Sequence, residues 1–489
     1  MADHRGIEIE IMLGGAPDDT FELRGAVGRE SLSRLFELDV LFYREGGPFT
    51  PDQMDAVLGG RCAVALGPAD GDVFQGILSS LTLLDSTTQK SGHYLARVVP
   101  TAWLLTLART NRIFPNMTLP AMIEALLTDY GMGRGKEFDI LAQGGVKREY
   151  VVQYEESDWD FVQRWLEHEG FFYWFEHDAS GDKLIIADAN DDATPIASPV
   201  NLSYRDRNSL SAGATTSVWE WRERLQRTAA RVALVDYNYR TPTVPLAVKE
   251  DADPKNGFGS VFSYGENFKD PDEGKALAKL RAERVFCERR TFTGRTDCSR
   301  FRVGHTFELD NHPVPGQDGE YLITSIEHRV GIAPDNPHDN TSHGYTATFS
   351  AIPKKVPFRP ERKTPWPRIH GVLHAHIDAD TSGDYAQLDD QGRYKVKMPF
   401  DVSPRKGTKS SHWIRMAESY SGKSYGQHFP LHKGAEVLVA HIDGNPDRPV
   451  IVGTVPNPVT KSPVTSANAT QSVLQTASGV RMEIEDLQS

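Results

Sequence analysis

The clearest hydrophobic pattern lies in the last quarter of the chain. Apolar and basic side chains alternate from Tyr394 to Phe400, and this period of two predicts a half-buried β-strand. Short β-rich runs follow at 435–442 and 449–455, with the turn-forming residues 443–447 between them. Strands of this length joined by turns predict a small closed barrel, because closure leaves no free sheet edge.

The same alternation marks two longer regions nearer the N-terminus. Apolar residues alternate with acidic ones at 7–11 and 36–42, and strand patterns continue to about residue 105. Strand patterns return between 215 and 350, interrupted by one helical pattern near 272–284. The first region predicts a barrel or sandwich, and the second predicts a barrel like it.

Between these regions the hydrophobic period lengthens to that of a helix. Thr118 can begin one helix that ends at Gly131, and Ser157 can begin a second that ends at Gly170. Their apolar faces consist of Met122, Ile123, Leu126, Leu127 and Tyr130 in the first and Phe161, Val162, Trp165 and Leu166 in the second. An aromatic strand at 171–177 follows directly, so the sequence predicts an α/β insertion whose strand packs in the core.

Two segments near the C-terminus show no barrel pattern. Residues 353–368 are proline-rich and basic, which predicts a semi-rigid connector. In the tail, Val480, Met482 and Ile484 alternate with charged residues. Such a strand cannot bury its apolar side alone, whereas three copies wound together can.

Several long sequence phrases resemble one protein family. Two phrases within 410–457 resemble the OB (oligosaccharide/oligonucleotide-binding) barrel of VgrG, the type VI secretion spike. They are SSHWIRMAESYSGKSYG and FPLHKGAEVLVAHIDGNPDRPVIVGTVPN. Contractile-phage tail spikes have a similar barrel. The phrase LSRLFELDVLF resembles the N-terminal barrel of VgrG. A longer phrase resembles the region between the VgrG barrels, and it reads REYVVQYEESDWDFVQRWLEHEGFFYWFEHD.

This resemblance implies a mainly β, multidomain fold. It would contain two hub β-barrels with an α/β insertion, an OB-fold barrel and the start of a triple-stranded needle β-helix. We expect the boundaries to be 1–105 for the first hub barrel, 106–205 for the insertion, 206–352 for the second hub barrel, 353–368 for the linker, 369–457 for the OB domain and 458–489 for the start of the needle.

The resemblance also implies a mechanical role in a homotrimer. The hub would sit on a tube of Hcp protein within a baseplate, a PAAR-type tip protein would cap the needle, and effector proteins would be carried. The target membrane would be contacted mechanically. Val480, Met482 and Ile484 would lie at the trimer interface, in a needle of which only about the first strand is present, with no effector domain after it. We therefore expect no catalytic residue, cofactor or metal.

The charge and cysteine content of the chain limit the kinds of partner and the cellular compartment that fit it. A formal net charge of -13 argues against nucleic-acid binding, because proteins that bind nucleic acid are usually basic where they contact it. Cys62, Cys287 and Cys298 form no CxxC pair, which indicates a reducing compartment. No signal-peptide pattern and no 18-residue apolar run is present. We expect synthesis in the cytoplasm, assembly in a baseplate, and export to the extracellular space or a target cell.

The residues leave the class of machine open. A type VI secretion system, an extracellular contractile injection particle and a phage baseplate would all use this architecture. An enzyme is a further alternative, because Ser424 is central in a G-x-S-x-G match and the acidic residues around Glu156 could act on a glycan. The flanks of Ser424 lack a helical pattern, and carboxylates are common at a helix start.

Two patterns could bind a metal. His370, His374 and His376 are close in sequence, and oxygen-bearing residues from Asp378 to Asp389 partly match a calcium loop. Position twelve of that loop is Asp rather than Glu, and both flanks have strand patterns. Histidines on an exposed strand and an acidic hairpin loop are the simpler interpretations.

Overall fold

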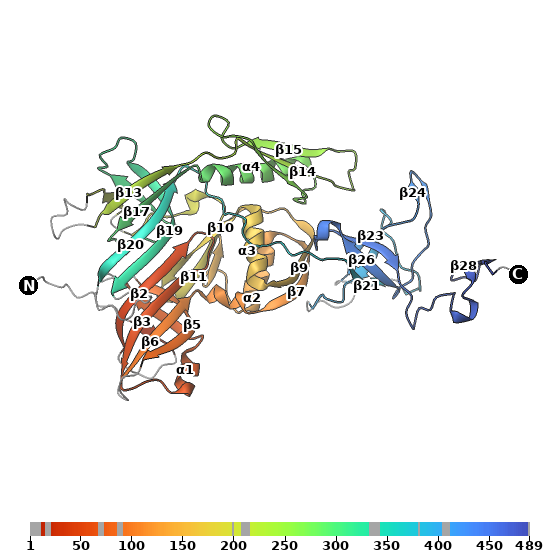
Figure 1. The fold of residues 1–489 in the computed structure, drawn as a ribbon, viewed down its shortest axis with the longest axis horizontal. Coiled ribbons are helices and arrows are strands. Elements are labelled where there is room, and N and C mark those ends of the chain that lie inside the picture. The colour runs from red at the N-terminus through yellow and green to blue at the C-terminus, as the bar shows by residue number, and fades with distance from the viewer. Residues whose placement is uncertain are drawn as a thin grey trace, which may run out of the picture. The chain divides into compact units, whose positions relative to one another are not determined.

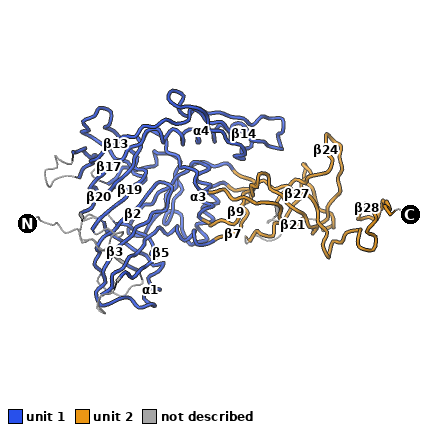
Figure 2. The backbone as a smooth tube through the Cα atoms, viewed as in Figure 1, with its two compact units in different colours: residues 1–108, 118–146, 159–364 blue, residues 109–117, 147–158, 365–489 orange. Residues whose placement is uncertain are grey.

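The computed structural model describes residues 11–14, 21–66, 73–85, 91–197, 200–206, 216–331, 343–379, 382–402 and 411–487. Its backbone divides into two compact units, shown in Figure 2. Unit 1 draws on residues 1–108, 118–146 and 159–364, and unit 2 on residues 109–117, 147–158 and 365–489.

Unit 1 contains a sheet of twelve strands within the described residues (Figure 1). Ten of them follow the order β1-β4-β5-β6-β3-β2-β19-β20-β17-β13, and β12 and β18 pair beside β19. Their bounds are β1 (Ile11–Leu13), β2 (Phe21–Ser31), β3 (Glu37–Glu45), β4 (Arg61–Ala65), β5 (Val73–Asp85), β6 (Ser91–Val99), β12 (Asn201–Ser203), β13 (Val218–Leu225), β17 (Arg290–Thr296), β18 (Thr306–Asp310), β19 (Gly319–Gly331) and β20 (His343–Pro353).

Apart from three strands between residues 231 and 264, which form a separate sheet, the two strand regions that the sequence predicts belong to this one sheet. They meet where β2 pairs antiparallel with β19, from Ser31 opposite Ser325 to Gly25 opposite Gly331. The mainly β class is confirmed, and the continuity across the junction is an additional finding. The helix α1 (Pro51–Val57) and the 3-10 helix η1 (Thr101–Thr106) lie in the connections of the N-terminal strands.

Three hydrogen-bonded side chains, Glu30, His328 and Tyr345, lie buried where β2 pairs with β19. The His328 ring is 0% exposed, with Nε2 2.6 Å from a carboxylate oxygen of Glu30 and Nδ1 2.6 Å from the hydroxyl of Tyr345. Burial lowers the pKa of His328, so a neutral ring that donates from Nε2 and accepts at Nδ1 fits these contacts. Burial opposes ionisation of Glu30, but the bond from His328 and the nearby charges hold its pKa below the usual value.

The α/β insertion contains the two predicted helices. These are α2 (Leu119–Asp129) and α3 (Asp158–Glu169), and their predicted apolar faces are buried except for the half-buried Tyr130. Gly131 and Gly170 follow with φ of 76° and 72°, values that glycine adopts without strain. The three-stranded sheet β10-β11-β8 completes the insertion, with β8 (Phe138–Ile140), β10 (Phe172–Asp178) and β11 (Gly181–Ala187). Phe172, Tyr173 and Trp174 are at most 2% exposed, which confirms that the aromatic strand lies in the core.

A smaller layer of unit 1 pairs one helix with three strands. The sheet order is β15-β14-β16, with β14 (Arg231–Asp236), β15 (Leu246–Asp251) and β16 (Ser260–Tyr264). The helix α4 (Pro271–Cys287) packs on β14 and β15 through Leu277 and Ala278. Asp270 caps α4, because its Oδ1 accepts from the backbone N–H groups of Asp272 and Glu273.

Unit 2 contains the predicted closed barrel. Its strands are β21 (Val372–Asp378), β22 (Tyr394–Lys397), β23 (Ser411–Met416), β27 (Pro449–Thr454) and β26 (Glu436–His441), in that order around the barrel. Tyr394, Val396 and Met398 are at most 1% exposed, as their alternation predicts. Ile113 and Val152 join this core from the antiparallel pair of β7 (Arg109–Met117) and β9 (Arg148–Ser157).

One barrel histidine is buried without a polar partner. His441 is 8% exposed, and neither ring nitrogen has a hydrogen-bond partner among the described residues. Burial lowers the pKa of His441 to about 4.

Two small hairpins complete unit 2. One joins β24 (Ser421–Gly422) to β25 (Tyr425–Gly426), and the other joins β28 (Gln471–Gln475) to β29 (Arg481–Glu485). Both pairs are antiparallel. The short 3-10 helices η5 (Ile442–Gly444) and η6 (Ser466–Asn468) lie in the connecting segments.

Candidate functional site

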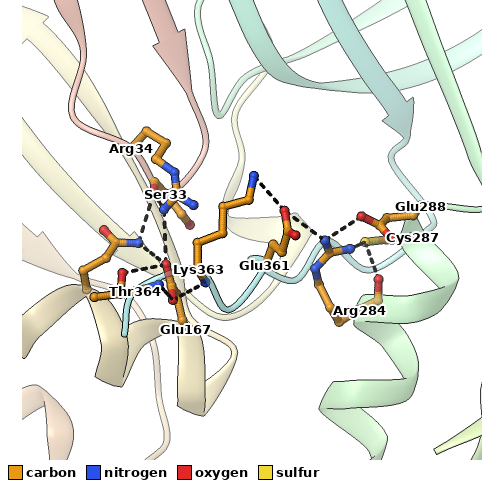
Figure 3. Close-up of polar contacts among 10 residues, drawn as sticks. Ser33, Arg34, Glu167, Arg284, Cys287, Glu288, Glu361, Lys363 and Thr364 are labelled. Atoms are coloured by element: carbon orange, nitrogen blue, oxygen red, sulfur yellow. Dashed lines mark hydrogen bonds and ion pairs between the residues drawn. The ribbon is translucent and has the colours of Figure 1, made fainter. Parts of the chain in front are cut away.

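Most of the predicted connector is fixed to unit 1. Residues 354–364, which we call the strap, follow β20 directly and hydrogen-bond to α3, α4 and the 3-10 helix η2 (Asn190–Asp192). Figure 3 shows its C-terminal end, with Glu361, Lys363 and Thr364 among side chains from other segments. Because buried polar and charged side chains from several elements converge on the strap, its contacts are the candidate functional site.

The side chain of Asn190 binds the backbone of the N-terminal half of the strap. Its Nδ2 donates to the carbonyl oxygens of Lys354 and Val356, each at 2.7 Å, and its Oδ1 accepts from the N–H of Phe358 at 2.9 Å. The Phe358 ring also meets the edge of Phe172, with 5.4 Å between centroids. These contacts are neutral, so salt should affect them little.

Arg359 connects the middle of the strap to three other segments. Its guanidinium lies 2.7 Å from the Glu283 carboxylate of α4 and donates to the carbonyl oxygens of Gly170 and Asp188. One planar side chain therefore joins the strap to α4 and to the segments that flank β10 and β11.

Glu266 forms the first of two carboxylate anchors. Its side chain is 4% exposed and accepts from Arg362 of the strap at 2.6 and 2.9 Å and from Arg281 of α4 at 3.1 Å. Burial alone would raise the pKa of Glu266, but the charges of Arg281 and Arg362, with a bond from Ser263, hold it at about 2. The carboxylate therefore stays ionised at all ordinary pH values.

Glu167 of α3 forms the second anchor, at the end of the strap. Its side chain is 0% exposed, and one oxygen accepts from the backbone N–H groups of Lys363 and Thr364 at 2.9 Å each. The other oxygen lies 3.1 Å from the Thr364 hydroxyl, 2.9 Å from Gln163 Nε2 and 3.2 Å from Arg34. A buried carboxylate with this many donors fixes the strap in one position.

A third acidic residue lies near these anchors but remains exposed. Glu361 lies 3.7 Å from Arg284 and 2.8 Å from the ammonium of Lys363, with half of its side chain exposed (Figure 3). A carboxylate this exposed contributes less to stability through its pairs than the two buried anchors do.

Ser424 does not occupy a nucleophile elbow. It lies with Lys423 in the turn between the two-residue strands β24 and β25, with φ of 60°. An elbow would need a buried strand before the serine and a helix after it.

The acidic residues near Glu156 are divided between different environments. Glu156 is 7% exposed at the end of β9, whereas Glu155 is exposed with φ of 46°. Asp158 is 0% exposed and accepts from the Thr110 hydroxyl and Gln153 Nε2, each at 2.6 Å. Asp158 thus connects the start of α3 to side chains of β7 and β9.

One of the three candidate metal-binding histidines is paired with a carboxylate. His370, His374 and His376 are exposed, and His374 Nδ1 lies 2.6 Å from Glu436. No group of three metal-binding side chains occurs within the described part of the chain.

The calcium-loop pattern lies partly outside the described residues, at 380–381. Asp378 accepts from the N–H of Ala379, at the end of β21. Asp389, the twelfth position, accepts from the Arg393 guanidinium at 2.6 Å and from the N–H groups of Gln391 and Arg393. Its carboxylate is therefore already engaged by an arginine.

The predicted trimer residues lie on and beside β29. Val480, Met482 and Ile484 are between 61% and 66% exposed in the single chain. Their place at a trimer interface stays a prediction.

Sequence patterns did not indicate the anchors of the strap. Asn190, Glu266 and Glu167 each act on partners about 100 to 200 positions away, and no local period marks them. Only the proline-rich, basic composition of the connector hinted that acidic partners could hold it.

Comparison with known families gives two matches in sequence order. Residues 29–334 match the phage tail baseplate hub (GPD) family, and residues 385–455 match the type VI secretion system/phage-baseplate injector OB domain. The first match alone covers more than half of the chain.

Several curated proteins are similar along nearly the whole chain. The type VI secretion system spike proteins VgrG1b and VgrG1c of Pseudomonas aeruginosa are 28% and 29% identical, over 97% and 93% of this chain. The actin cross-linking toxin VgrG1 of Vibrio cholerae is 28% identical over 96% of it. The chain spans 63%, 62% and 43% of the length of these three relatives.

Solved structures show the same fold. The Escherichia coli c3393 protein, a component of the type VI secretion system, aligns with a TM-score of 0.67 and 24% identity, over 91% of this chain and all of that one. A chain of the half-lidded Francisella PdpA-VgrG complex aligns with a TM-score of 0.62 and 9% identity, over 96% and 81% of the two chains. Among the described residues, no helix has the length and apolar character needed to cross a membrane.

The two family matches thus place a hub region before an OB barrel, and the closed barrel of the structure lies in the second of them. The chain belongs to the phage tail baseplate hub family, and it is similar along nearly its whole length to VgrG spike proteins of type VI secretion.

Proposed function

We propose that this chain is the hub and spike of a type VI secretion machine and works as a homotrimer. The observation that carries the proposal is the order of parts in one chain, a hub match at 29–334 and an injector OB match at 385–455, shared with VgrG spikes. The exposed apolar side chains of β29 support self-association, because they are neighbours on a strand that is otherwise charged.

The proposed partners are those that this role requires. The hub would connect to a tube of Hcp protein within the baseplate, and the needle would carry a PAAR-type tip and effector proteins. The trimer would contact the target membrane mechanically, after synthesis in the cytoplasm and export by the machine itself. We propose no cofactor, no metal and no nucleic-acid partner.

A second contractile machine remains a candidate. The hub family takes its description from phage tails, and a prophage tail protein of Shewanella oneidensis aligns with a TM-score of 0.50 over 72% of this chain. A phage baseplate or an extracellular injection particle would need the same hub. Release of Hcp protein by cells with and without this gene separates the two candidates.

An enzymatic role is the third candidate, through Ser424 or Glu156. The actin cross-linking activity in the name of the Vibrio cholerae relative belongs to that protein, of which this chain spans 43%. Ser424 and Glu156 lie in environments that suit a turn and a strand end. Purified chain should therefore leave ester and peptidoglycan substrates intact, and cleavage that Ser424→Ala or Glu156→Gln abolishes would establish the enzyme.

Two measurements test the main proposal. Light scattering on the purified chain should give three times 54.4 kDa, and a monomer at all concentrations would contradict a trimer of this chain. In cells, deletion of the gene should stop the release of Hcp protein into the medium. Unchanged release would overturn the spike role.

A further inference from the structure

One strand of unit 1 contributes almost nothing to the hydrophobic core. β16 lies at the edge of the sheet β15-β14-β16, and within the described residues it pairs only with β14. The helix α4 packs on β14 and β15 (Figure 1), and the buried cluster between them contains no residue of β16. The apolar side chains of β16 therefore add little to the stability of this layer.

These side chains are instead exposed, and most of them are aromatic. Phe258, just before the strand, is 80% exposed, and Phe262 and Tyr264 within it are 65% and 60% exposed. Phe262 and Tyr264 lie two positions apart, so they project from the same face of the sheet. A cluster of exposed apolar side chains is typical of a contact surface.

The backbone of β16 also has an open side. The N–H of Gly265 donates to the carbonyl of Val235, so the odd-numbered positions of β16 face β14. The N–H and carbonyl groups of Ser260, Phe262 and Tyr264 consequently face away from the sheet, where the described part of the chain supplies no strand. Such a row of donors and acceptors is a template for another strand.

Two other edge strands of unit 1 differ from β16 in charge. β13 carries Glu220 and Arg222, and β15 carries Lys249 and Asp251. Charged side chains on an edge strand discourage pairing with another chain. Residues 260–264 contain neither a charge nor a proline, which is the composition that favours such pairing.

We propose that β16 binds an extended segment of a partner protein, which adds to this sheet as a fourth strand. The segment would span about five residues, without charge or proline, with apolar side chains at alternate positions beside Phe262 and Tyr264. Main-chain hydrogen bonds to the open side of β16 would hold it in register. Binding at this edge does not depend on the chain being a spike.

The size of the aromatic surface favours a single strand over a second copy of the chain. Phe258, Phe262 and Tyr264 together offer roughly 400 Å² of exposed surface. A stable interface between two folded proteins needs about 800 Å² on each partner. A strand needs less apolar area, because its main chain supplies hydrogen bonds along the whole edge.

Hydrogen exchange on the full chain with a model peptide tests this docking. The peptide alternates valine and threonine over about eight residues, with a lysine at each end for solubility. At millimolar concentration it should slow exchange at the N–H groups of Phe262 and Tyr264 roughly tenfold or more, because both would donate to the peptide. The same peptide with two central prolines is the control and should give no protection.

A matched pair of variants assigns the protection to this edge. Phe262→Lys places a charge on β16 and should abolish the protection of Tyr264 by the peptide. Leu225→Lys is the control, because Leu225 is 61% exposed on the charged strand β13, and it should leave the protection unchanged. The N–H of Gly265, bonded to Val235, reports whether the sheet itself stays intact.

Each outcome supports or contradicts the docking of a strand. Protection that is lost in Phe262→Lys and kept in Leu225→Lys would support it, and no protection at millimolar peptide would overturn it. Amides of β16 that are already protected in the purified chain, and lose protection on dilution, would show that a second copy covers the edge. That result would also overturn the proposal. If Phe262→Lys accelerates exchange at Gly265, Phe262→Thr replaces it, because threonine removes the ring and keeps strand propensity.

Discussion

At the residue scale, the buried polar groups of unit 1 depend on each other. His328 is fully enclosed, yet Glu30 and Tyr345 satisfy both of its ring nitrogens. A buried carboxylate costs little free energy while it is paired, and much more when its partner is removed. The pairing of β2 with β19 is therefore accompanied by a buried polar group centred on one histidine.

We predict that His328→Leu lowers the free energy of unfolding of unit 1 by about 3 kcal/mol, because Glu30 is left buried without its partner. Tyr345→Phe removes only a hydroxyl and should cost about 1 kcal/mol. Urea unfolding followed by tryptophan fluorescence measures both. Adding Glu30→Gln to His328→Leu should recover part of the loss, and a double variant no more stable than the single one would contradict the pairing.

His441 predicts how the barrel of unit 2 responds to pH. Its pKa is about 4 in the folded barrel and about 6.5 in an unfolded chain, so the unfolded chain binds more protons between these values. Barrel stability should fall as pH drops from about 6.5 toward 4. His441→Phe should remove this loss, so its advantage in urea midpoint over the native chain should be larger at pH 5 than at pH 7.5. An equal difference in urea midpoint between the two proteins at both pH values would contradict this prediction.

At the element scale, local patterns predicted the helices and most strands well. The apolar faces of α2 and α3 and the glycines that end them are as the sequence indicates, because a helix of this kind is specified by residues within a few turns. The pairing of β2 with β19 was not predictable, since its partners are about 300 positions apart and carry no matching signal. The anchors of the strap were not predictable for the same reason, because they bind partners far away in the sequence. The connector itself was predicted from its composition.

The two helix starts predict different responses to the same kind of substitution. Asp270 accepts two N–H bonds at the start of α4, whereas the Thr118 side chain makes no capping bond at the start of α2. Asp270→Ala should lower the free energy of unfolding by about 1 kcal/mol and Thr118→Ala by a few tenths at most. Chemical denaturation measures both, and equal losses would contradict the difference in capping.

At the scale of the whole molecule, the exposed face of β29 predicts assembly. Met482→Asp should weaken a trimer, because a charge would be buried where three copies meet. In a dilution series followed by light scattering, the Met482→Asp variant should dissociate at a higher protein concentration than the native chain does. Glu483→Gln, on the opposite face of the same strand, should leave the mass unchanged. Equal masses for Met482→Asp and the native chain would place β29 outside the interface.

The docked strap has a consequence for how this chain can be divided. Residues 354–364 behave as a peptide ligand that unit 1 carries on its own chain, at an effective concentration on the order of millimolar. A chain that ends at Pro353 would keep the receptor and lose the ligand. The free peptide should then bind in trans, and the same peptide should compete with the intact chain only above millimolar concentration. This stretch of covalent chain could thus be replaced by a reversible contact.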